Sequence, residues 1–271
     1  MTMIQKIIKY CVMVFAILLV VGIVGGMASF VYSFTKNDEN EVSADYKFEQ
    51  VENIKVDVGA INVDLITGDH FEVQIPEGKD NVKVRLEDKK TLVVKQKSGW
   101  FHFDIASNRS NKRRIVIIVP KDFYARKVEL DLGTGNMKIE QLHTKELQLD
   151  GGVGNVKGKN IESERTKIDG GVGNIEFENV KFNDLNFDCG VGNVGISGEI
   201  TGKSEIHCGV GNVDVEVDDS IENYDLEIQS DVGKVCVNGE KVKDYEREGV
   251  SAKHSLEIDG DVGSVDLDFL R

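Results

Sequence analysis

A repeat of 19 residues is the feature of this sequence that most limits the folds available to it. Its five regular copies read DLGTGNMKI, DGGVGNVKG, DGGVGNIEF, DCGVGNVGI and HCGVGNVDV, and they begin at Asp131, Asp150, Asp169, Asp188 and His207. Weaker copies begin at Asp57, Gln229 and Asp259. A fixed period of this length is typical of solenoids, in which each repeat buries its apolar face only by stacking on its neighbours.

The residues after each glycine motif alternate between apolar and polar. Asn174, for example, is followed by Ile175, Glu176 and Phe177, and short alternating segments such as LQL, TKI and LNF precede the motifs. A period of two indicates strands with one buried face. We therefore predict an all-β fold, a β-solenoid in the form of a single-stranded, β-helix-like stack of coils of about 19 residues. Eight coils at a strand spacing of about 4.8 Å would form a rod roughly 35–40 Å long.

One copy also contains the pattern of a dinucleotide-binding loop. Gly190, Gly192 and Gly195 match G-x-G-x-x-G, a pattern that can hold a pyrophosphate at the start of a helix. The segment that follows is alternating and β-branched, whereas such a loop must open a helix in a βαβ unit. Gly195 also stands where other copies have Lys, Glu or Asp. We therefore exclude nucleotide binding and predict no cofactor.

We interpret the recurring polar residues of the motif as structural. The glycines allow positive φ at tight corners, the aspartates accept hydrogen bonds from the turn, and the asparagines stack as an amide ladder. This predicted turn ladder consists of Asp131, Asp150, Asp169, Asp188, Asn136, Asn155, Asn174, Asn193 and Asn212.

The motif also resembles the start of a calcium-binding β-roll repeat, G-G-x-G-x-D-x-U-x. Val156 stands where that repeat requires its aspartate ligand, so we predict no metal site. Stacked aspartates about 5 Å apart repel one another unless they are solvated, hydrogen-bonded or bridged by a cation. Weak calcium binding by this column therefore stays an open alternative.

The four cysteines show no spacing that suits zinc. Cys189 and Cys208 occupy the same place in neighbouring copies, in a column of small residues. We interpret them as two buried thiols, and a disulfide between them stays open. Cys236 falls in an outward column, where it would be a surface thiol.

Residues 10–34 contain no charged side chain and are long enough to cross a bilayer. Lys6 and Lys9 precede this segment and acidic residues follow it, which predicts an uncleaved transmembrane signal anchor with residues 1–9 in the cytoplasm and the bulk of the chain outside the cell membrane. A cleaved signal peptide is the alternative, but its apolar region would be shorter. The remaining predicted parts are a linker at 35–44, an N-terminal β region with the first coil and capping strands at 45–130, and the tandem-repeat solenoid at 131–271.

The chain has a formal net charge of −14, and every acidic residue and all but three basic ones lie beyond residue 36. A strongly acidic body argues against nucleic acid as a partner.

The region between the first coil and the regular repeats holds strand candidates at 71–75, 82–86, 91–96, 100–105 and 114–119. We expect them to form hairpins or wider coils that cap the rod. An aromatic cluster and a basic loop in this region are candidates for binding a protein, lipid headgroups or an anionic wall polymer. Their residues are Trp100, Phe101, Arg109, Lys112, Arg113 and Arg114. The favoured alternative is a core-facing aromatic pair beside a solvated hairpin tip.

The sequence contains neither a G-x-S-x-G nor an H-E-x-x-H motif, and its five histidines are scattered. We therefore predict that the protein is not an enzyme.

Several segments together resemble a known bacterial family. They are the N-terminal anchor, IKVDVGAINVDL, TLVVKQ, RIVIIVPKDF leading into VELDLGTGNMKIEQL, and the tandem GGVGNV coils. Over residues 45–271 the chain is similar to the toastrack or "putative adhesin" family, which includes LiaG-like proteins of Gram-positive envelopes. Lys234 and Ser264 depart from the pattern, because they replace the repeat asparagine.

The resemblance implies a non-enzymatic extracytoplasmic β domain linked to envelope-stress sensing or adhesion. We accordingly expect a membrane-anchored envelope scaffold or sensory module with a membrane or cell-wall protein or polymer as partner. A surface adhesin and, less well supported, a β-helix enzyme acting on polysaccharide are the alternatives.

Overall fold

A computed structural model of the chain describes residues 42–48, 50–76, 81–96, 114–249 and 252–271. These residues belong to one compact unit, Glu41–Ile105 with Arg113–Arg271. The predicted anchor at 10–34 lies outside them. Among the residues described, no helix is long and apolar enough to cross a membrane.

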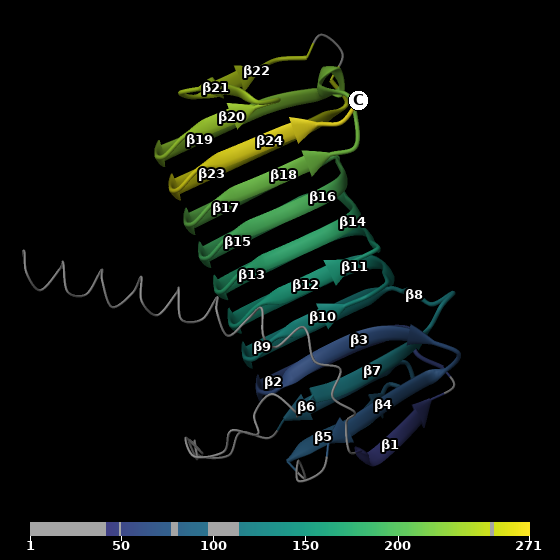
Figure 1. The fold of residues 1–271 in the computed structure, drawn as a ribbon. Helices are drawn as coiled ribbons and strands as arrows, with labels where there is room; N and C mark the ends of the chain where they lie inside the picture. Colours follow the sequence, from purple (N-terminus) through teal and green to yellow (C-terminus); the bar gives the residue numbers. More distant parts are fainter. Residues whose placement is uncertain (1–41, 49, 77–80, 97–113, 250–251) are drawn as a thin grey trace, which may run out of the picture. The chain divides into compact units, whose positions relative to one another are not determined.

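The described residues form an all-β stack of coils, and each coil has two main strands joined at a glycine corner (Figure 1). We call these the first and second sides of the stack. The first side contains β2 (Asn53–Ala60), β9 (Lys127–Thr134), β11 (Leu142–Val153), β13 (Ile161–Val172), β15 (Leu185–Val191), β17 (Lys203–Val210), β19 (Tyr224–Val232) and β23 (His254–Val262). The second side contains β3 (Asn62–Gly68), β10 (Met137–Ile139), β12 (Val156–Lys159), β14 (Ile175–Asn183), β16 (Val194–Thr201), β18 (Val213–Val217), β20 (Val235–Val237) and β24 (Val265–Phe269). The all-β, solenoid-like part of the predicted fold is thus confirmed.

Strands of successive coils pair in parallel and in register, so that equivalent residues form columns. Val156, for example, lies opposite Met137 on one side and Ile175 on the other. All three are buried, as the alternating pattern requires. The core is therefore a set of apolar columns that run through the stack between the two sides.

The central coils have a short third side. The first residues of β11 and β13 pair with each other, and β13 pairs in turn with the end of β14. β8 (Tyr124–Ala125) extends this side by pairing with β11. Thr144 and Ser163 are buried here and bond to main-chain oxygens of their own strands, Glu146 at 3.0 Å and Arg165 at 2.8 Å.

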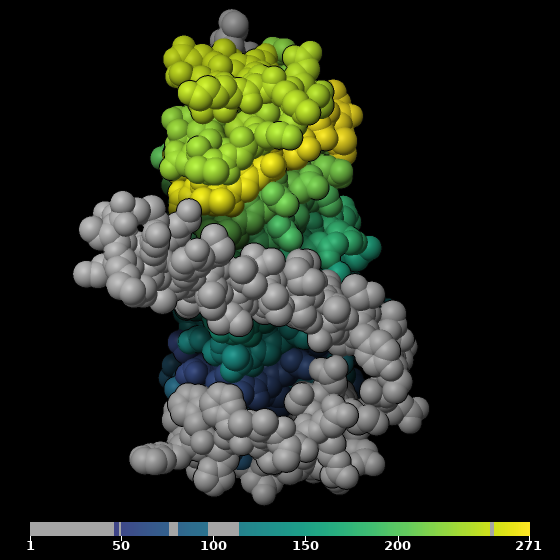
Figure 2. Space-filling model, turned by 60° about the vertical axis from the view of Figure 1, so that its left-hand side comes forward, coloured from purple at the N-terminus to yellow at the C-terminus, as the bar shows by residue number. Residues whose placement is uncertain are grey.

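The order of the coils in space differs from their order in the chain. β23 pairs in parallel with both β17 and β19, and β24 pairs in parallel with both β18 and β20. The last coil of the chain is thus inserted between its two predecessors, as the yellow band between two green ones shows in Figure 2. The expectation that successive copies stack in sequence order is wrong at this end.

Both ends of the described stack are covered. At one end β6 (Thr91–Gln96) and β7 (Arg114–Pro120) add parallel strands to β2 and β3, so the stack has one more level than the eight predicted. Antiparallel strands β5 (Val82–Glu87), β4 (Phe71–Pro76) and β1 (Val42–Phe48) follow. At the other end β22 (Tyr245–Arg247) pairs antiparallel with β19, and β21 (Glu240–Val242) pairs antiparallel with β20. A 3-10 turn, η2 (Ile221–Asn223), comes directly before β19.

Four of the predicted strand segments, 71–75, 82–86, 91–96 and 114–119, correspond to β4, β5, β6 and β7. The segment 100–105 lies outside the described residues. β1 begins inside the predicted linker at 35–44, because residues 42–48 pair with β4.

The inserted coil predicts an unusual pattern of hydrogen exchange. β24 ends two residues before the last residue of the chain, where strands ordinarily fray. Its main chain is nevertheless bonded on both sides; Val265 N–H donates to Lys234 O at 2.8 Å, and Ser264 O accepts from Val213 N–H at 2.9 Å. We expect amides of residues 265–269 to exchange as slowly as those of β18, measured by hydrogen–deuterium exchange mass spectrometry. Exchange at the rate of a frayed terminus would contradict the insertion.

Candidate interaction surface

In six of the coils, one glycine makes the corner possible. The column consists of Gly135, Gly154, Gly173, Gly192, Gly211 and Gly263, with φ between +140° and +155°. This backbone conformation is strained for any residue with a side chain. A Cβ on Gly154 would also lie 1.8 Å from the carbonyl oxygen of Gly135. The corners therefore stack with main chain directly on main chain, and no side chain fits between them.

Gly195, the third glycine of the nucleotide-loop pattern, has a different environment. It lies in β16, and a Cβ there would meet nothing within 4 Å. This open position agrees with the interpretation that the G-x-G-x-x-G match is incidental.

The asparagines beside the corner form a ladder of hydrogen bonds. The Oδ1 atom of each accepts the main-chain N–H of the next, for example from Asn155 to Asn136 at 3.0 Å and from Asn174 to Asn155 at 2.9 Å. The ladder continues through Asn193 and Asn212 to the N–H of Ser264 in the inserted coil. Each bond satisfies a main-chain donor that the tight corner would otherwise leave without a partner.

The aspartates of the turn ladder stand elsewhere than predicted. Asp131, Asp150, Asp169 and Asp188 lie within first-side strands, on the outward face, and pair in register with one another. The hydrogen bonds at the corner come from the asparagines instead. Burial, followed by the charges of Asp150 and Asp57, raises the pKa of Asp131. Asp131 is thus repelled by its neighbours in the column, whereas Asp169 has Lys167 as an ion-pair partner at 3.0 Å.

A ridge of valines runs beside this aspartate column, and the sequence analysis did not single it out. Its members are the valines directly before the last glycine of the corner: Val153, Val172, Val191, Val210, Val262 and Val232, in spatial order. Five of them are 44–65% exposed, and Val191 is half-buried. Exposed apolar residues that form a contiguous line mark interaction sites more often than scattered ones do. The recurrence of valine in the motif was the sequence signal for this ridge.

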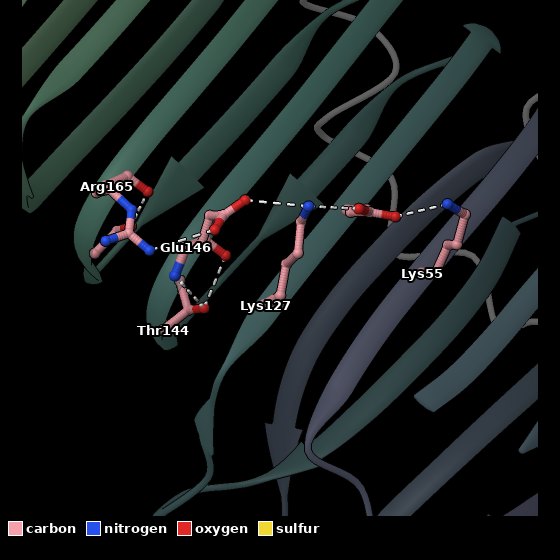
Figure 3. Close-up of polar contacts among 7 residues, drawn as sticks. Lys55, Lys127, Thr144, Glu146 and Arg165 are labelled. Carbon is pink, nitrogen blue, oxygen red and sulfur yellow. Dashed lines mark hydrogen bonds and ion pairs between the residues drawn. The ribbon is translucent and has the colours of Figure 1, made fainter. Parts of the chain in front are cut away.

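The first side carries different charge patterns at its two ends. Near β2 the charges alternate, because Lys55 and Lys127 bracket Glu129 at 2.6 and 2.7 Å. Glu146 continues the line, 3.1 Å from Lys127 and 3.5 Å from Arg165 (Figure 3). The hydrogen bonds of Glu129 with Lys127 and then Lys55 lower its pKa. These pairs link four successive coils.

At the other end of the first side, four glutamates stand in a row on neighbouring strands. Glu205, Glu257, Glu227 and Glu246 are register partners across β17, β23, β19 and β22. Lys203 lies 2.8 Å from Glu205. A shallow groove of about 270 Å³ lies over these strands. This row makes the first side acidic near the inserted coil.

Of the predicted partner-binding residues, Trp100, Phe101, Arg109, Lys112 and Arg113 lie outside the described residues. Arg114 is the first residue of β7 and pairs with Asp64 at 2.8 Å. Its guanidinium therefore links β7 to β3, and the predicted contact with a partner stays untested.

Cys189 and Cys208 are register partners on β15 and β17, and both are buried free thiols. The hydrogen bond with Cys189, followed by burial, raises the pKa of Cys208. The sulfur atoms of Cys189 and Cys208 lie 4.0 and 3.7 Å from the carbonyl oxygen of Gly192, within reach of a weak hydrogen bond. Cys236 is partly exposed on β20.

One group of metal-ligating side chains comes together within the described part of the chain. His207, Asp259 and Asp261 place one ligand atom each within 4.8 Å of the others. The column of Asp131, Asp150, Asp169 and Asp188 forms no such group there, so the weak calcium binding considered for it gains no support from the geometry.

Comparison with known proteins supplies a family. The sequence model of the Toastrack DUF4097 family matches residues 51–259. No curated protein matches the chain at a significant level.

Two solved structures illustrate the similarity. A "putative cell adhesion protein" from Clostridium sporogenes has 20% sequence identity and a TM-score of 0.39, with 83% of this chain and 98% of that chain covered. A "putative adhesin" from Bacteroides fragilis has 18% identity and a TM-score of 0.38, with 83% and 95% covered.

The glycine corner predicts that two glycine-to-alanine substitutions, one at a corner and one outside it, differ strongly in their effect on stability. Gly154→Ala forces a strained φ and a main-chain clash, so we expect it to lower the free energy of unfolding by about 3 kcal/mol or more. Gly195→Ala, the matched control, should change it by less than about 0.5 kcal/mol. Urea unfolding of the two variants measures both values. Equal stabilities would show that the corner does not require glycine.

Proposed function

Because the chain belongs to the Toastrack DUF4097 family, we propose that it is a non-enzymatic interaction module of the cell envelope, acting as a scaffold or stress sensor. Residues 10–34 anchor it in the cell membrane, with the N-terminus in the cytoplasm and the β stack outside. It binds a protein or polymer of the membrane or cell wall along the outer face of its first side.

The observation that carries this proposal is the valine ridge beside the aspartate column. Val153, Val172, Val210 and Val262 expose nearly half or more of their surface at the same position of four coils, and the half-buried Val191 lies between Val172 and Val210. Strands of neighbouring coils are about 4.8 Å apart, so the ridge offers an apolar contact at each such step along a rigid support. A surface of this kind suits an extended partner that makes the same contact repeatedly. The adjacent carboxylates favour partners that carry positive charge.

The main chain of the stack supports a binding role over a catalytic one. Strand pairing, the asparagine ladder and the glycine corners hold each coil at a fixed distance from the next. Such repeat stacks bind partners over long surfaces, whereas catalysis requires side chains that converge on one reacting bond.

The proposed topology has a direct test in Cys236. This thiol is partly exposed, while Cys189 and Cys208 are buried. If the stack lies outside the membrane, a membrane-impermeant maleimide should label Cys236 in intact cells, as read by mass spectrometry of the full chain. Cys236→Ser should abolish the label. Labelling that requires lysed cells would place the stack in the cytoplasm and overturn the proposed topology.

The proposed binding surface can be tested by comparing the first side of the stack with the second. A photo-crosslinking residue at position 172, on the valine ridge, should capture a membrane or cell-wall partner in living cells. The same residue at position 195, on the outward face of the second side, is the matched control because its side chain meets open space. Val172→Asp combined with Val210→Asp should reduce recovery of the partner at least tenfold while leaving the melting temperature nearly unchanged, since both positions are exposed.

Each alternative function predicts a different result of this experiment. Equal capture at positions 172 and 195, or none at either, contradicts binding through the ridge. Capture of a component from outside the producing cell supports the surface adhesin. Turnover of a wall polysaccharide by the purified chain would overturn the non-enzymatic proposal.

A further inference from the structure

At one level of the stack, the aspartate column has a histidine in place of an aspartate. It runs from Asp57 through Asp131, Asp150, Asp169 and Asp188, and its next member is His207 on β17. The following partner in register is Asp259 on β23, the inserted coil. Asp261 lies two residues further along the same strand and therefore on the same face. The only imidazole of the column thus lies between carboxylates at the point where the last coil enters the stack.

We propose that His207, Asp259 and Asp261 bind one divalent transition-metal ion of the Zn²⁺ type, which joins β17 to the inserted coil. Residues that are 52 positions apart in sequence form this site, and they meet because β23 lies beside β17 rather than beyond β19.

The spacing of the three groups fits an ion better than it fits direct hydrogen bonds. His207 Nδ1 is 3.6 Å from the Asp259 carboxylate, and the other ring nitrogen, Nε2, is 4.0 Å from that of Asp261, so the ring turns when one nitrogen binds the ion. Hydrogen bonds between such groups are about 2.7–3.2 Å long. Ligands of a tetrahedral zinc ion, each about 2.0–2.2 Å from the metal, are roughly 3.4 Å apart. One ring nitrogen and two carboxylate oxygens, all within 4.8 Å of one another, can therefore surround an ion after small side-chain rotations.

The ligand types select among cations. An imidazole nitrogen with two carboxylate oxygens suits Zn²⁺ and similar transition metals. Calcium takes six to eight oxygen ligands and gains little from an imidazole. Three protein ligands leave further coordination positions for water or for a group on a partner.

The surroundings favour entry of a cation. Asp188 is the register partner of His207 on its other side, and Glu205 and Glu257 occupy the preceding outward positions of the two strands. Lys203 offsets part of the charge of Glu205 at 2.8 Å, and the other carboxylates raise the local concentration of counter-ions. The three side chains are 45%, 33% and 50% exposed, so an ion reaches them directly from solvent.

Binding would stabilise the inserted coil specifically. The ion binds only when β23 lies beside β17, so it shifts the equilibrium toward the state in which the last coil is inserted. The proposed site therefore adds a side-chain link to the main-chain hydrogen bonds that hold the C-terminal coil.

Titration of the full-length chain in detergent with Zn²⁺ tests the site. We expect one tightly bound ion per chain by calorimetry, and a rise in melting temperature of about 5 °C at saturating Zn²⁺. His207→Gln and Asp259→Asn should each weaken Zn²⁺ binding at least tenfold and remove the temperature shift. Asp150→Asn, which removes a carboxylate of the same column three coils away, and His143→Gln, which removes a histidine of another column, are the matched controls and should bind within about twofold of the parent chain.

Two outcomes would overturn the proposal. One is the absence of Zn²⁺ binding, or binding that His207→Gln and Asp259→Asn leave unchanged. The other is equally tight binding of Ca²⁺ that Asp150→Asn weakens, which would assign the cation to the aspartate column. The partner captured at position 172 is measured independently, so either proposal can fail while the other stands.

Discussion

The contact of main chain with main chain at the glycine corners is the constraint on which the rest of this structure depends. A carbonyl oxygen of one coil occupies the space where a side chain of the next would begin, as Gly154 shows against Gly135. The coils therefore cannot slip or tilt past one another, and the asparagine amides bond across the same step. Because the register is fixed there, each position of the repeat becomes a column. The residue type at each position of the repeat then determines whether the side chains of successive coils attract one another, repel one another or pack as apolar groups.

Because the register is fixed at the corners, some features of the structure could be predicted from the sequence and others could not. The alternation after each motif predicted the buried columns of Val156 and Ile175, because burial follows from the period of two regardless of how the coils are ordered. The motif did not reveal the role of the aspartates, since an aspartate three or four residues before a glycine corner suits a strand and a turn equally well. The hydrogen-bonding role fell to the neighbouring asparagine, whose side chain points along the stack. The valine ridge was overlooked because a valine in a strand-rich sequence is ordinarily a core residue.

The order of the coils could not be predicted from the repeat. Copies with similar motifs are equally able to pair with any neighbour, so sequence similarity contains no information on which copy lies beside which. The longer segments before Gln229 and Asp259, and the loss of the repeat asparagine at Lys234 and Ser264, were the signs of irregularity. In the structure, β19 does not pair with β17, because one level is left between them. β21 and β22 then cover the outer coil, and β23 fills the level between β17 and β19. The proposed contacts of Trp100 and its neighbours stay a prediction from sequence, since they lie outside the described residues.

The inserted coil also determines the order in which the coils can fold during synthesis of the chain. Up to β18, each regular coil can dock on the one synthesised before it, so the stack can grow as the chain emerges. β19 and β20 have no such support, because their parallel neighbours, β23 and β24, are the last strands to be made. The final two coils therefore close as a unit only after β23 and β24 have left the ribosome. A chain interrupted between β20 and β23 would keep an open strand edge on β17 and β18, and that edge would expose the unfinished chain to proteases.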